Sequence, residues 1–220
     1  MDDDLDRRSL LNSIAAAGLA PGVPAQSTGR RKRRTARCAD GPPRIPNIKP
    51  EEYNDAVRAF LAQVEGPGGR KAGSSLNIVL MLAHHPELAK RYFSFGSYLM
   101  GYSTLDPRLR ELVVLRTSWL YGSDYEWTKH VITAQKVGVT PAEVEAVKAG
   151  PRAAGWGSLE RDLLSATDQL VRHNCIEDAT WAGITRHFDK KQQLDFVFTI
   201  TSYVMLAMVL EALRVPLEGA

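Results

Sequence analysis

The sequence predicts an all-α fold, a compact helical bundle, from three observations. Apolar residues recur at helical spacing almost throughout the chain after residue 44, and alternating apolar and polar runs closed by turn pairs are missing. Helix start and stop signals recur along the same stretch. The 220 residues are 44% hydrophobic and 24% charged, which is ordinary for a soluble globular protein of one domain.

Prolines, glycines and capping residues set the expected helix boundaries in chain order. A Pro-rich segment over residues 41–46 precedes the first helix, in which Pro50 takes the first position. The glycines at 66–69 end that helix. We expect helices over residues 50–64, 76–83, 86–100, 107–121, from 123 onward, 141–150, 158–173, 178–187 and 190–214.

The clearest start signal lies at Asp106, a good N-cap, followed by Pro107 at the first helical position. Gly122 then supplies a left-handed stop, and a second helix begins at once. Further on, Thr140 and Glu143 form the sequence of a capping box. These signals predict a tight pair of helices in the middle of the chain.

Residues 1–43 differ from the folded domain expected over 44–220, and we expect them to form a flexible basic arm. Residues 1–44 hold nine Lys or Arg and five Asp or Glu, a net charge of +4, whereas the other residues sum to −1. The body therefore gives no sign of nucleic-acid binding. Arg7 and Arg8, ahead of a weakly apolar stretch, resemble a twin-arginine export signal over residues 1–25. We expect a cytoplasmic protein, with export as the alternative.

The longest apolar stretch, residues 196–210, is expected to be buried rather than to cross a membrane. It is 15 residues long, contains several hydroxyl side chains and is closed by Glu211. A spanning helix needs about 20 mostly apolar residues. We expect no membrane span, and a helix that packs in a core or a subunit interface.

One segment of the chain carries most of the chemical signal. Ser123, Glu126 and His130 stand at i, i+3 and i+7, so they share one face of a helix. Glu111 belongs to the preceding helix, and its carboxylate meets the imidazole of His130 if the intervening turn folds the two helices together. Such pairing orients a general base and holds it in one tautomer.

Each of these residues also has a structural interpretation. Ser123 and Glu126 form the sequence of a capping box, which satisfies helix-end N–H groups without chemistry. Glu111 alone is typical of a solvated first-turn carboxylate, and His130 of a hydrogen-bonded core histidine. The combination favours a functional site, because four such groups seldom converge on one helical hairpin.

The spacing of these four residues resembles the carboxymuconolactone decarboxylase family, which includes the alkyl hydroperoxidase D-like proteins. In the peroxidase branch, a Glu is followed after eleven residues by Cys, after two by Cys and after three by His. This chain has Glu111, Ser123, Glu126 and His130 at those positions. The resemblance also covers residues 110–116 and 122–127, and more weakly the whole body of the chain. It implies an alkyl hydroperoxidase D-like helical fold, assembled as dimers, trimers or hexamers.

The residues at the two cysteine positions decide between the activities of that family. Thiol peroxidase chemistry needs a thiolate nucleophile and a resolving thiol. Positions 123 and 126 carry serine and glutamate, and the two cysteines of the chain, Cys38 and Cys175, form no CxxC pair. We therefore expect no thiol peroxidase activity.

The resemblance then implies a cofactor-free acid–base lyase that acts on a small, anionic, carboxylated lactone or a related enol or keto acid. The alternative is a catalytically silent oligomeric binding module of the same fold. We expect His130 to transfer the proton, Glu111 to orient it and Glu126 to act as a second acid or base. The expected substrate-binding residues are Ser123, Tyr125, Lys129 and Arg116. We expect no metal, although one imidazole with two carboxylates is also a ligand set for a divalent ion.

Overall fold

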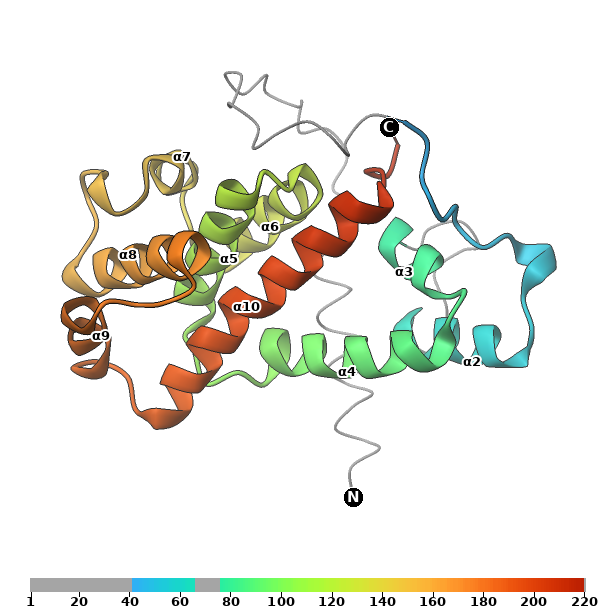
Figure 1. Ribbon diagram of the computed structural model, residues 1–220, viewed down its shortest axis with the longest axis horizontal. Helices are drawn as coiled ribbons and strands as arrows, with labels where there is room; N and C mark the ends of the chain where they lie inside the picture. Colours follow the sequence, from blue (N-terminus) through green and yellow to red (C-terminus); the bar gives the residue numbers. More distant parts are fainter. Residues whose placement is uncertain (1–40, 66–75, 220) are drawn as a thin grey trace. The chain divides into compact units, whose positions relative to one another are not determined.

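The computed structural model describes residues 41–65 and 76–219, which form helices and connecting loops without any strand (Figure 1). The predicted all-α class is confirmed. Residues 1–40 of the predicted arm, which include the twin-arginine pair, lie outside the described residues. The helices are α2 (Asp55–Glu65), α3 (Asn77–Leu82), α4 (Pro86–Gly101), α5 (Pro107–Tyr121), α6 (Asp124–Lys136), α7 (Pro141–Ala149), α8 (Ser158–His173), α9 (Asp178–Thr185), α10 (Lys190–Leu213), and the 3-10 turns η1 (Pro50–Glu52) and η2 (Gly150–Arg152).

Most helix boundaries agree with the sequence prediction to within two residues, but the predicted helix over 50–64 is divided. Residues Pro50–Glu52 form the 3-10 turn η1, and Tyr53 is extended, with φ of −72° and ψ of 115°. Helix α2 starts after Asn54, whose Oδ1 accepts a hydrogen bond from the N–H of Val57 at 2.9 Å. The Asn54 side chain thus caps a new helix, and this local bond competes with continuation of the first turn.

The described chain divides into two compact units, each with its own core. The first unit comprises residues 41–65, 76–102 and 210–219, and the second comprises residues 103–209. In the first unit, α4 packs against α2 and α3, and the rings of Phe60 and Phe93 lie 5.8 Å apart between centroids.

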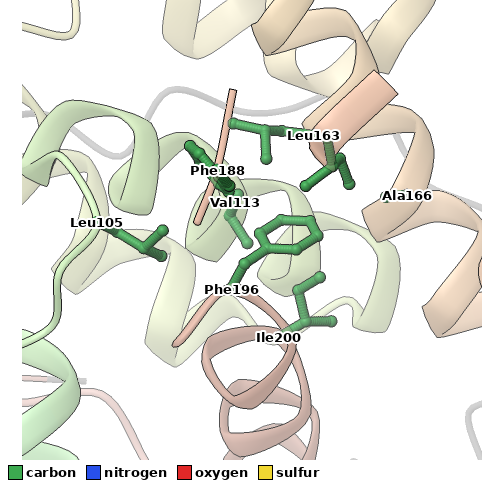
Figure 2. Packing of buried hydrophobic residues seen from close by; sticks show 8 residues of the cluster. Leu105, Val113, Leu163, Ala166, Phe188, Phe196 and Ile200 are labelled. Carbon is green, nitrogen blue, oxygen red and sulfur yellow. The ribbon is translucent and has the colours of Figure 1, made fainter. Parts of the chain in front are cut away.

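Helix α5 runs through the middle of the second unit. Its residues 110–118 are all buried, because other helices cover it on every side. One apolar cluster lies between α5, α8, α9 and α10 (Figure 2) and consists of Leu105, Val113, Leu163, Ala166, Ile184, Phe188, Phe196 and Ile200. A second cluster joins α5 to α6, α7 and α8 and consists of Leu112, Leu115, Ala134, Val139, Val144, Val147, Trp156 and Leu164. The central position of α5 lets it carry polar groups into the interior of the unit.

Helix α10 has one buried and one exposed apolar face. By length and composition alone, this 24-residue helix could cross a membrane, since an 18-residue window of it has a mean hydropathy of 1.9. Phe196 and Ile200 pack in the core of the second unit. On the outer face, large apolar side chains form an exposed stripe, the α10 stripe, made of Leu194, Phe198, Met205 and Met208. The absence of a membrane span stays a prediction.

Candidate active site

Local signals in the sequence build the hairpin of α5 and α6 that carries the site. Asp106 caps α5, since its Oδ1 accepts hydrogen bonds from the backbone N–H groups of Arg108 and Leu109 at 3.0 and 3.1 Å. Gly122 ends α5 with φ of +74°, a left-handed conformation that glycine adopts without steric cost. Helix α6 starts two residues later, and the two helices lie side by side.

The hairpin brings Glu111 and His130 together, as the sequence predicts. Oε2 of Glu111 lies 2.7 Å from Nδ1 of His130. Glu111 is wholly buried, whereas 12% of the His130 side chain is exposed. A carboxylate oxygen can only accept, so Nδ1 donates and Nε2 is left for another partner. The arrangement fixes one tautomer of the imidazole and leaves its second nitrogen available for proton transfer.

Tyr203 of α10 supports the imidazole from another side. Its ring meets the His130 ring edge to face, with centroids 4.8 Å apart and an angle of 85° between the planes. The Glu111 contact and this packing together restrict rotation of the His130 side chain. Tyr203 was not predicted as a site residue. The only feature of the sequence that could have indicated Tyr203 is that it is an aromatic residue with a polar hydroxyl inside an otherwise apolar helix.

Glu126 is a buried carboxyl group without a hydrogen-bond partner. It is 2% exposed, and neither of its oxygens has a partner in the part of the chain that the structure describes. Burial raises the pKa of Glu126 well above its usual value of 4.5, because the charged form loses its hydration. The Ser123 hydroxyl lies close enough to offset part of this pKa shift, without the geometry of a hydrogen bond. Glu126 therefore favours its neutral form, a carboxylic acid that can donate a proton.

Ser123 occupies the N-cap position of α6 but does not cap the helix with its side chain. Its Oγ is buried and has no partner within residues 41–65 and 76–219. Thr140, at the start of α7, shows the contrast, because it forms a complete capping box with Glu143. The capping interpretation of Ser123 and Glu126 is therefore wrong, and neither polar group has a partner in the part of the chain that the structure describes.

Arg116 has a structural role instead of the substrate-binding role predicted from the sequence. Its guanidinium pairs with the Asp168 carboxylate at 2.5 and 2.7 Å. Nη1 also donates to the backbone carbonyls of Val147 and Lys148, both at 2.9 Å. These bonds tie α5 to α7 and α8 and engage the whole planar head of the side chain. The guanidinium of Arg116 is therefore engaged by the protein, and Arg116 is not part of the candidate site.

Tyr125 and Lys129 lie one turn apart on α6, and their roles in substrate binding stay predictions. Nζ of Lys129 lies 5.8 Å from the centroid of the Tyr125 ring, a cation–π contact. Tyr125 is buried and Lys129 is partly exposed. The ammonium group thus contacts an aromatic face and still reaches solvent.

Arg110 lies beside the Glu111–His130 pair and was not predicted as a site residue. It is 6% exposed, and its Nε lies 3.5 Å from Oε1 of Glu111. The only feature of the sequence that could have indicated Arg110 is its position next to Glu111.

The described residues offer no metal site. Among them, no group of three or more His, Cys, Asp or Glu is arranged to hold an ion.

Comparison with known proteins agrees with the resemblance seen in the sequence. Residues 86–169 match the sequence model of the carboxymuconolactone decarboxylase family. This segment of the chain is similar to that family. It contains α4 to α7, most of α8, and all four residues of the Glu–Ser–Glu–His pattern. No curated protein sequence matches the chain.

Solved structures with the alkyl hydroperoxidase D-like fold share the architecture of this chain. A peroxidase-related protein from Ralstonia eutropha JMP134 is 19% identical over 82% of this chain and 95% of its own, with a TM-score of 0.68. A peroxidase-related protein from Silicibacter sp. TM1040 is 18% identical over 87% and 96%, with a TM-score of 0.67. A debrominase, Bmp8, solved with 2,3,4-tribromopyrrole, is 14% identical over 80% and 91%, with a TM-score of 0.61. At these identities, the likeness shows the fold.

Proposed function

We propose that this chain is a cofactor-free acid–base enzyme of the carboxymuconolactone decarboxylase type. Its substrate would be a small carboxylated lactone or a related enol or keto acid. The observation that carries the proposal is the 2.7 Å contact between Glu111 and Nδ1 of His130. A carboxylate that holds an imidazole in one tautomer is the arrangement used to position a general acid or base.

In the proposed reaction, the carbon–carbon bond to the departing carboxylate breaks and CO2 leaves. The bonding electrons pass into the ring system as an enolate, which must take up one proton at carbon. The imidazolium form of His130 would deliver that proton from Nε2, while the Glu111 carboxylate faces its positive charge. The neutral imidazole then regains a proton from water.

The neutral carboxyl group of Glu126 would act on the oxygen of the same enolate. As a carboxylic acid, it can donate a hydrogen bond where negative charge develops, and a donor fixed in a water-poor site is effective there. The Ser123 hydroxyl would add a second hydrogen bond to a substrate oxygen. Neither group has a protein partner within the described ranges, which supports this use. Because their oxygens are wholly enclosed, the proposal requires a bound substrate to displace the side chains that cover them.

Thiol chemistry is not part of the proposal. The two motif positions that hold cysteine in the peroxidase branch carry Ser123 and Glu126 here. Cys175 is exposed beyond the end of α8, and Cys38 lies outside the described residues. Neither peroxide reduction nor thiol-dependent removal of a halogen is therefore proposed.

The test is a turnover assay of the full chain with 4-carboxymuconolactone, following lactone absorbance and CO2 release. We expect His130→Ala to lower turnover by about 10²- to 10⁴-fold, the usual contribution of a positioned acid–base group. His187→Ala, which removes an exposed imidazole from the loop after α9, is the matched control and should leave turnover unchanged.

Two outcomes would contradict the proposal. Full activity in folded His130→Ala protein would remove the histidine from the mechanism. A folded wild-type protein without turnover, which still binds the lactone, would instead favour the silent binding module. Circular dichroism of each variant distinguishes these results from a loss of the fold.

A further inference from the structure

Arg110 is a buried cation with few polar partners. Among the described residues, its guanidinium has one polar contact, from Nε to Oε1 of Glu111 at 3.5 Å. A guanidinium has five N–H donors, so most of them have no protein acceptor here. Buried cations are normally paired and hydrogen-bonded, because losing water without a replacement partner costs free energy. The shortage of partners at Arg110 therefore calls for an explanation.

Two neighbouring arginines on α5 show what a structural guanidinium looks like in this unit. Arg116 meets the two oxygens of one carboxylate and two backbone carbonyls. Arg108 contacts the carboxylates of Glu143 and Glu160, although its side chain is 29% exposed. Arg110 is nearly as enclosed as Arg116 and yet contacts a single oxygen. A structural role in the fold therefore does not explain why the N–H donors of Arg110 are buried with so few acceptors.

The two Nη atoms of Arg110 remain reachable from outside. Neither is among the wholly enclosed side-chain atoms that lack a partner in the described chain, a group that includes Ser123 Oγ and both Glu126 oxygens. Because neither Nη atom has a protein partner among the described residues, both keep some contact with solvent. The planar end of the side chain is therefore not sealed from solvent.

Glu111 joins Arg110 to the proposed reaction centre. Its Oε1 faces Nε of Arg110 at 3.5 Å, and its Oε2 faces Nδ1 of His130 at 2.7 Å. The guanidinium and the imidazole thus lie on the two oxygens of one carboxylate. A substrate anion on the Nη atoms would be held close to the group that exchanges the proton.

We propose that Arg110 binds a carboxylate of the substrate through its two Nη donors, and so restricts the substrates of this site to small carboxylic acids. The planar fork of arginine matches a carboxylate with two parallel hydrogen bonds. This inference rests on the proposed acid–base function for its reaction, but the binding that it describes can be measured without turnover. Arg110 would thus join the substrate-binding residues, among which Arg116 and Lys129 were predicted from the sequence.

The carboxylate held by Arg110 is expected to be one that stays on the substrate. An ion pair to the departing group would stabilise a charge that disappears as CO2 forms, which would slow the reaction. A contact to a retained carboxylate is equally strong in the ground state and the transition state, so it lowers KM without changing kcat. With 4-carboxymuconolactone, the retained group is the acetate side chain.

The test measures binding of a lactone that cannot react, 5-oxotetrahydrofuran-2-acetate, against its neutral methyl ester. Titration calorimetry on the full chain should show that wild-type protein binds the acid more tightly, by on the order of ten- to a hundredfold. Arg110→Gln should abolish this preference, and His130→Ala should keep it. Arg172→Gln, which removes an exposed arginine of α8, is the control and should behave as wild type.

The outcomes separate this inference from the proposed function. If His130→Ala protein prefers the acid but wild type has no turnover, the carboxylate site at Arg110 is supported and the proposed decarboxylation is contradicted. If folded Arg110→Gln protein still prefers the acid, or if wild type binds acid and ester equally, the inference is overturned. If Arg110→Gln does not fold, NMR of isotope-labelled wild type provides the test instead. The proposal then requires that the acid shift the arginine Nη resonances and that the ester leave them unchanged. In an active enzyme, Arg110→Lys should raise KM and leave kcat nearly unchanged.

Discussion

Glu111 and His130 are nineteen residues apart in the chain, yet Oε2 of the carboxylate lies 2.7 Å from Nδ1 of the imidazole. The contact crosses from α5 to α6, and Gly122, in the turn between them, makes it possible. Because the carboxylate is wholly buried, solvent does not compete for the hydrogen bond. The imidazole is thereby fixed in one tautomer, and this predicts how the site responds to loss of the carboxylate.

Glu111→Gln should reduce turnover by about 10²-fold, the lower end of the contribution of an acid–base group. Glutamine keeps the size of the side chain but removes the charge that faces the imidazole. Nitrogen NMR of His130 should show that Nδ1 no longer carries the proton in a single tautomer. Glu145→Gln on the exposed face of α7 is the control. Unchanged turnover in folded Glu111→Gln protein would contradict the assigned role.

Glu126→Gln should change how stability depends on pH. The pKa of Glu126 is raised in the folded protein, so the folded state binds the proton more tightly than the unfolded state above the usual value of 4.5. The stability of wild type should therefore fall relative to Glu126→Gln as pH rises from about 4.5 to the folded pKa, by at most about 1.4 kcal/mol per pH unit.

Urea denaturation of both proteins between pH 4 and pH 8 measures this difference. Glu87→Gln is the matched control, because Glu87 is an exposed first-turn residue of α4 and should give a difference that does not vary with pH in this way. A constant difference between wild type and Glu126→Gln would show that folding does not raise the pKa of Glu126.

The two N-cap residues of α6 and α7 should respond differently to alanine. Thr140→Ala removes a complete capping box, and we expect a loss of about 1 kcal/mol in the free energy of unfolding. Ser123→Ala removes a hydroxyl that is 1% exposed and has no partner in the described chain. Its effect should be within about 0.5 kcal/mol or stabilising, because a buried polar group without a partner is unfavourable. An equal loss in both variants would show that Ser123 caps α6.

The α10 stripe predicts self-association of the chain. Together with exposed Thr201, its residues follow one another at intervals of four, three, four and three, the spacing at which two helices pack along a common seam. The seam has no charged side chain, and a second copy would bring the same apolar surface to it. We expect the full chain to be a dimer or a larger assembly.

Light scattering after size-exclusion chromatography measures the mass. The double change Leu194→Glu and Met208→Glu should give a monomer, whereas Gln135→Glu on the exposed face of α6 should not alter the assembly. A wild-type protein that is monomeric in buffer and binds lipid vesicles would show that a membrane, and not a second copy, covers the stripe.

Much of the fold and the pairing of the site follow from local features of the sequence. Asp106 and Pro107 start α5 and Gly122 ends it, because capping and left-handed turns involve residues that are close in the chain. Once the hairpin is known, helical periodicity is enough to predict that Glu111 meets His130. The division of the first predicted helix was missed, because Asn54 is one polar residue among several that could cap.

The tertiary structure decided which polar side chains are already engaged. The sequence does not distinguish Arg110 from Arg116. Only the packing of α8 shows that Arg116 pairs with Asp168, which lies fifty-two residues further along the chain. Likewise, the sequence alone does not show that Ser123 and Glu126 are buried without partners in the described chain. The sequence determines which groups the α5–α6 hairpin carries, whereas long-range packing determines which of them have a protein partner and which remain available to a substrate.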